Sequence, residues 1–142
     1  MKLSILLAIA AAPLLAEPGA PKILRAIAMV ESGEDPLAVG DSGKALGAWQ
    51  MHPAAWQDAN DFRAAQGLPH LSRARWREPG VQEGVAKAFL CLIQTRLAGA
   101  GVVRPTPGQI ALCWNLGFAG AKARSFRPTD YSTRVARLVK IL

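Results

Sequence analysis

Residues 22–53 read KILRAIAMVESGEDPLAVGDSGKALGAWQMHP, and we base the architecture expected for the whole chain on this stretch. Their first part is an apolar run with helical spacing that ends near Glu31. Gly33 stops this helix, and the glycines from Gly40 to Gly47 separate short apolar pieces, as in a small hairpin or an irregular loop. The stretch therefore predicts a buried first helix followed by a short β element.

Downstream, helical patterns alternate with connections that contain glycine and proline. Pro53 suits a first helical turn, and its helix ends before Gly67. A longer apolar stripe runs from Val81 to Gly99. Residues 106–109 can form a capping box at the start of another helix. The last segment places an apolar set on one helical face: Tyr131, Val135, Leu138 and Leu142. These patterns predict one mainly α domain with a small β-hairpin.

Residues 1–16 have the pattern of a secretory signal peptide. One positive charge, Lys2, precedes an apolar run that extends to Ala12, and we expect cleavage after Ala16. The alternatives are a buried N-terminal helix or an uncleaved membrane anchor, although a spanning helix needs roughly 20 apolar residues and this run is shorter. We therefore expect residues 17–142 to be an exported domain, periplasmic or extracellular, with no stable membrane span.

The chain is strongly basic, with a formal net charge of +7 that becomes +6 (7 − 1) when Lys2 leaves with the signal peptide. A basic protein favours anionic partners. The arginines are scattered along the sequence rather than gathered in one run, so nucleic acid is not the expected partner. The polyanionic cell envelope suits an exported chain better. Scattered arginines can also simply solvate the surface, and both interpretations stay open at this point.

Neither the cysteines nor the histidines predict a metal site. Cys91 and Cys113 lack the spacing of metal ligands or of a redox pair. In an oxidising compartment they could form a disulfide between two helices, or they could be two buried thiols that pack as small hydrophobic residues. His52 and His70 have no suitable neighbour at metal-ligand spacing and receive no role. We expect no metal and no organic cofactor.

Glu31 is the candidate catalytic residue because of its position. It follows an apolar run at the end of its predicted helix, beside a loop rich in glycine. Partial desolvation there would raise the pKa of the carboxyl group, and a helix C-terminus also disfavours a negative charge. Cleavage of a glycosidic bond needs such a general acid to protonate the leaving oxygen. Position alone favours a different interpretation, in which Glu31 simply ends its helix in solvent.

The surrounding residues resemble the signature of the lysozyme-like superfamily, particularly the soluble lytic transglycosylase type. The first motif consists of Glu31, Ser32, Gly33, Pro36, Ala38, Gly40, Gly43, Ala45, Gly47, Gln50 and Pro53. Residues 111–117, ALCWNLG, resemble the second motif of that family, usually alanine, tyrosine, asparagine, any residue and glycine. Tyr131 and the residues after it resemble the closing helix. Order and spacing agree from about Ile23 to the C-terminus.

This resemblance implies an α+β lysozyme-like fold and an enzyme that cleaves peptidoglycan glycan strands. Glu31 would be the single catalytic acid and base at the β-1,4 bond between N-acetylmuramic acid and N-acetylglucosamine, and the product would carry a 1,6-anhydro-muramic acid end. The residues expected to contact the substrate are Ser32, Trp49, Gln50, Trp114, Asn115 and Tyr131. Trp114 replaces the usual tyrosine, so its indole can stack on a sugar but supplies no phenolic hydroxyl.

Two other functions compete with this interpretation. Asp41 lies ten positions after Glu31 (41 − 31) and would be the second carboxylate of a hydrolytic lysozyme, or else only an aspartate that caps its own turn. A wall-binding or secretion-apparatus module with little activity is the rival of another class, but a pure binder has no need of an acid in its groove. We expect Asp41 to be dispensable and the protein to be a monomer.

Overall fold

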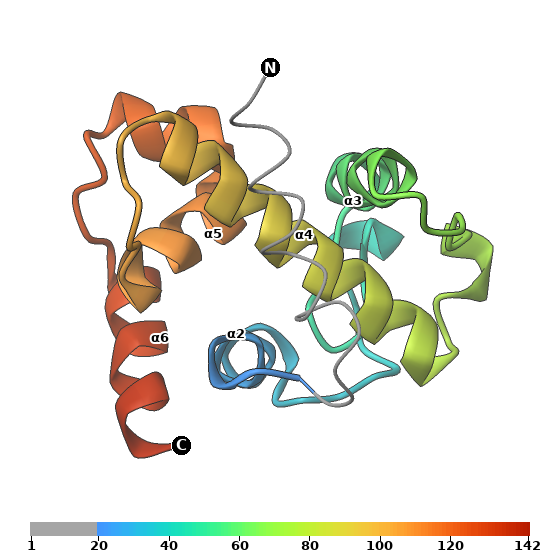
Figure 1. Ribbon diagram of the computed structural model, residues 1–142. Helices are drawn as coiled ribbons and strands as arrows, with labels where there is room; N and C mark the ends of the chain where they lie inside the picture. The colour runs from blue at the N-terminus through green and yellow to red at the C-terminus, as the bar shows by residue number, and fades with distance from the viewer. Residues whose placement is uncertain (1–19) are drawn as a thin grey trace.

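The computed structural model describes residues 20–142, so the predicted signal peptide lies outside the described residues. The predicted fold class is confirmed: the described chain is mainly helical and has a small two-stranded antiparallel hairpin (Figure 1). Within this part of the chain, no helix is both long enough and apolar enough to cross a membrane.

The elements follow the order predicted from the sequence. They are α2 (Lys22–Ser32), β1 (Val39–Gly40), the 3-10 turn η1 (Asp41–Gly43), β2 (Ala45–Leu46), α3 (Pro53–Ala65), the 3-10 turn η2 (Arg73–Arg75), α4 (Pro79–Gly99), α5 (Pro107–Ala123) and α6 (Asp130–Ile141). Helix α2 ends at Gly33, whose φ of 66° is left-handed. The capping box predicted at Thr106 and Gln109 is present, and a second box caps α6.

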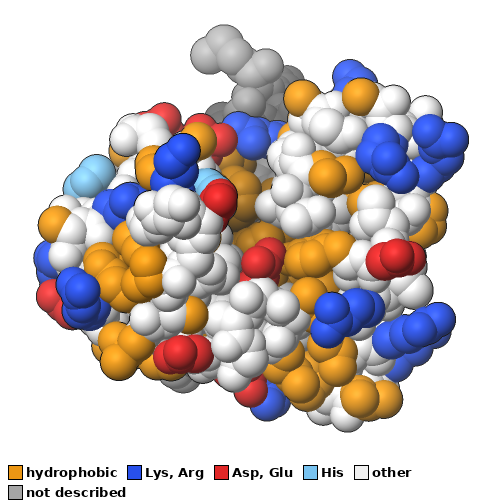
Figure 2. All heavy atoms as spheres, turned by 180° about the vertical axis from the view of Figure 1, so that it is seen from behind, with side chains coloured by type: hydrophobic (Ala, Val, Ile, Leu, Met, Phe, Trp, Pro, Cys, Tyr) orange, Lys and Arg blue, Asp and Glu red, His pale blue; other side chains and the backbone are white. Residues whose placement is uncertain are grey.

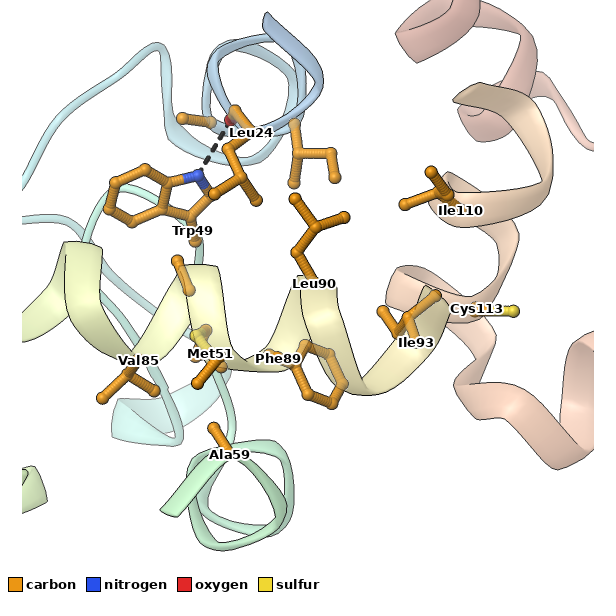
Figure 3. Packing of buried hydrophobic residues seen from close by; sticks show 14 of the residues in the cluster. Leu24, Trp49, Met51, Ala59, Val85, Phe89, Leu90, Ile93, Ile110 and Cys113 are labelled. Atoms are coloured by element: carbon orange, nitrogen blue, oxygen red, sulfur yellow. Dashed lines mark hydrogen bonds between the residues drawn. The ribbon is translucent and has the colours of Figure 1, made fainter. Parts of the chain in front are cut away.

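Helix α4 runs through the centre of the molecule, with α3 packed on one side and α5 joining it near its C-terminal half (Figure 1). Its apolar side chains meet those of α2, α3 and α5 in one continuous core (Figure 3). Leu90, Ile93 and Leu97 are almost completely buried. Cys91 and Cys113 are both free and buried in this core, so the structure shows two packed thiols rather than a disulfide. Burial raises the pKa of each thiol to about 11.

The hairpin is fastened to α4 by one buried amide. Gln82 is only 3% exposed, and its Oε1 accepts a hydrogen bond from the backbone N–H of Ala48 at 3.0 Å. Its Nε2 donates to the carbonyl oxygens of Pro36, at 2.7 Å, and Trp76, at 2.6 Å. Gly47 lies against this amide with a φ of 80°, and a Cβ at this position would clash with it. Gln82 therefore determines where the hairpin sits relative to the core.

Candidate active site

Glu31 lies in the last turn of α2, with its side chain only partly exposed. Helix α6 packs against α2 and places Tyr131 beside it, and the tyrosine hydroxyl donates a hydrogen bond of 2.7 Å to Oε1 of Glu31. This contact joins residues 100 positions apart. The family resemblance implies substrate contact for Tyr131, whereas its hydroxyl here binds the carboxyl group of Glu31.

Burial is the largest effect on the acidity of Glu31, and it raises the pKa of the carboxyl group above its ordinary value. The hydrogen bond from Tyr131 and the nearby imidazole of His52 favour the ionised form and lower the pKa in part. The net direction is upward. Glu31 therefore keeps its proton to a higher pH than an exposed glutamate, as a general acid requires.

A cleft of about 510 Å³ opens beside Glu31. Its lining comes from the end of α2, the hairpin and its turn, α3, α4 and the middle of α5 and includes Glu31, Asp41, Gln50, His52, Asp58, Phe89, Arg96, Trp114 and Asn115. Figure 2 shows a hollow between two parts of the molecule, with hydrophobic side chains on its floor and acidic side chains beside it. Five segments of the chain thus converge on one candidate acid.

The structure brings three of the predicted substrate-contacting residues to this cleft. Gln50 has a left-handed φ of 48°, and its Nε2 donates to the carbonyl oxygens of Ala38 and Gly47 at 3.2 and 3.0 Å. Trp114 packs edge-on against Phe89 with ring centroids 4.9 Å apart. Asn115 follows it on α5 and is exposed.

Two other predicted contacts are corrected. Trp49 is a core residue, 9% exposed, whose indole N–H donates to the carbonyl oxygen of Leu24 at 2.8 Å (Figure 3), so its ring is not available for stacking on a sugar in the cleft. The hydroxyl of Ser32 donates to the carbonyl oxygen of Ala48 at 2.7 Å and accepts from the N–H of Asp35 at 3.0 Å. Ser32 therefore connects the helix end to the hairpin and does not line the cleft.

Asp41 lies in the cleft and pairs with His52, whose Nε2 is 3.2 Å from Oδ2 of the carboxylate. Asp41 and Ser42 have left-handed φ values of 51° and 55°, a conformation that costs free energy in residues other than glycine and is more common for Asp and Asn than for Ser. Metal-ligand spacing in the sequence predicts no role for His52. Its place between Gln50 and Pro53, two residues of the first motif, was the signal available.

A second charged pair in the cleft has no local sequence signal. Arg96 of α4 lies 3.3 Å from Oδ2 of Asp58 on α3, and both side chains remain partly exposed. The two residues are 38 positions apart, so only the packing of α3 against α4 brings them together. In residues 20–142, no group of three or more His, Cys, Asp or Glu side chains could hold a metal ion.

In comparisons with known proteins, no family model, no curated protein and no solved structure matches this chain.

Proposed function

We propose that the protein is an exported peptidoglycan-cleaving enzyme, a lytic transglycosylase with a lysozyme-like fold. The observation that carries this proposal is a partly buried glutamic acid with a raised pKa, held by a tyrosine hydroxyl, at the side of a cleft large enough for sugar rings. The motif resemblance centred on the same Glu31 supports the choice of a glycan strand as substrate. No cofactor is required by the chemistry.

The reaction would use Glu31 twice. The protonated carboxyl group gives its proton to the leaving oxygen of N-acetylglucosamine as the bond to the anomeric carbon of N-acetylmuramic acid breaks. The carboxylate then takes the proton of the muramic 6-hydroxyl while that oxygen bonds to the same anomeric carbon. The products are a free hydroxyl on one sugar and a 1,6-anhydro ring on the other, and the proton returns to Glu31.

The remaining cleft residues have roles that suit a sugar ligand. Trp114 offers an aromatic face for a sugar ring, and its packing on Phe89 fixes the plane of the indole. Asn115 supplies an amide donor and acceptor on the same wall. Tyr131 acts as a positioning residue, because it contacts Glu31 and is not part of the cleft lining.

A hydrolytic lysozyme is the second candidate function. It is favoured by one observation: Asp41 lines the same cleft as Glu31 and is paired with His52, as a carboxylate that activates water or attacks the sugar would be. In that reaction the product would carry a reducing end.

The variant Glu31→Gln tests the proposal. The amide is nearly isosteric and still accepts the hydrogen bond of Tyr131, but it has no proton to give. General acid catalysis contributes about 10²- to 10⁴-fold, so clearing of purified peptidoglycan should fall by at least the lower factor while the melting temperature changes little. Clearing at the wild-type rate by this variant would remove Glu31 from the mechanism.

A further inference from the structure

Most of the net positive charge of the described chain belongs to its last two helices and the loops before them. Residues 20–99 contain nine Lys and Arg against eight Asp and Glu, a surplus of +1 (9 − 8). Residues 100–142 contain seven against one, a surplus of +6 (7 − 1). These last residues form α5, α6 and the loops before each of them. Arginines occur in both parts of the chain, but only in α5, α6 and these loops do they lack a matching number of acidic residues.

Six of these cations form an exposed set that we call the basic surface. It consists of Lys122, Arg124, Arg127, Arg134, Arg137 and Lys140, from the end of α5, the following connection and α6. Within residues 20–142, none of the six takes part in an ion pair. Arg134, Arg137 and Lys140 recur at helical spacing on α6, whereas Val135 of the same helix is buried in the core. The surface is therefore unneutralised.

The basic surface adjoins the cleft but differs from it in charge. Helix α6 also carries Tyr131, which holds Glu31, and α5 also carries Trp114 on the cleft wall. The charged residues of the cleft itself are mostly acidic: Glu31, Asp41 and Asp58 against Arg96, with His52 beside them. The cleft therefore suits an uncharged sugar chain, and the same helices present cations outside it (Figure 2).

We propose that the basic surface binds the carboxylates of the peptide stems of the strand that occupies the cleft. This inference rests on the proposed function and adds a second contact to it. The stems leave the glycan at each muramic acid, so anionic groups project from a strand whose sugars are neutral. Cations on the outer side of the cleft wall would hold these groups, while the sugars meet Glu31.

The experiment compares two triple variants that remove the same charge from different places. Arg134→Gln, Arg137→Gln and Lys140→Gln remove three cations from the basic surface. The control, Lys22→Gln, Arg75→Gln and Arg77→Gln, removes three exposed cations that do not belong to the basic surface. Both sets are made in the Glu31→Gln background, so that the ligand stays intact. The ligands are labelled glycan strands of equal length, with their peptide stems, or with the stems removed by an amidase and the lactyl carboxylates that this frees converted to methyl amides.

We expect the basic-surface variant to bind strands with stems about tenfold more weakly than the background protein, because each exposed charge pair contributes only a modest part. The control should lose less than about twofold, and the difference should shrink as salt is added. On strands without stems, both variants should bind like the background protein. Equal losses in the two variants, or equal losses with and without stems, would overturn the proposal.

Two further outcomes separate this inference from its alternatives. Binding to vesicles of anionic phospholipids tests whether the basic surface recognises lipid instead. If the basic-surface variant loses vesicle binding but keeps strand binding, the surface binds lipid and the proposal is overturned. Failure of the wild-type protein to cleave strands that it binds through the basic surface would refute the proposed function alone. Normal cleavage with no contribution from the basic surface would refute only this inference.

Discussion

Replacing Gln82 by leucine should destabilise the protein severely, although the residue lies outside the cleft. Leucine has a similar size and suits a helix, but it offers no hydrogen bond. The N–H of Ala48 and the carbonyl oxygens of Pro36 and Trp76 would lose their partner. Each buried polar group left without one costs about 1–3 kcal/mol. Pro36 is exposed, so water can replace the bond to its carbonyl oxygen, and the expected total is about 3–5 kcal/mol.

This loss is large against the stability of a typical domain, about 5–15 kcal/mol. Equilibrium unfolding in urea, followed by circular dichroism, measures it as a lower midpoint. Gln57→Leu is the matched control, because its amide contacts only Asp61 at 2.8 Å on the exposed face of α3, and its effect should stay within about 0.5 kcal/mol. Equal midpoints for the two variants would refute the argument and mean that water or a rearranged backbone replaces the bonds of Gln82.

Substitutions in and beside the cleft should affect activity in different ways. Tyr131→Phe removes a hydrogen bond that favours ionised Glu31, so the pKa of Glu31 should rise further. The alkaline limb of the pH profile of kcat/KM should then move to higher pH. If that limb does not move, the Tyr131 hydroxyl has no electrostatic effect on Glu31. Trp114→Ala removes the aromatic face and should weaken glycan binding by roughly tenfold, seen in KM, with Trp114→Phe much closer to wild type. Asp41→Asn should keep most of the activity and release only 1,6-anhydro products. If this variant is inactive and the wild-type protein releases products with reducing ends, the enzyme is a lysozyme.

The elements of the fold could be predicted because their signals are local. Gly33 ends the first helix, and the capping box of Thr106 and Gln109 is visible within four residues of sequence. Glu31 could be singled out as a candidate because an apolar run leads directly to it and the first motif begins with it. The hairpin was expected from its glycines, and it forms with Val39 opposite Leu46.

The contacts that complete the site depend on packing between distant segments. The hydrogen bond from Tyr131 to Glu31 joins the first and last described helices, and no local pattern encodes it. The resemblance assigns Trp49 to the substrate, but the structure buries it, and its indole N–H is bonded to Leu24, 25 positions away on α2. The pairing of Arg96 with Asp58 likewise follows only from the crossing of α3 and α4.

The central claim is tested most directly by mass spectrometry of the muropeptides that the purified protein releases from peptidoglycan. If Glu31 acts as the single acid and base of a lytic transglycosylase, the wild-type protein releases muropeptides that end in 1,6-anhydro-muramic acid, one water lighter than hydrolysis products. The folded Glu31→Gln variant should release almost none. Absence of soluble muropeptides from the wild-type protein, or equal release by the two proteins, would contradict the account.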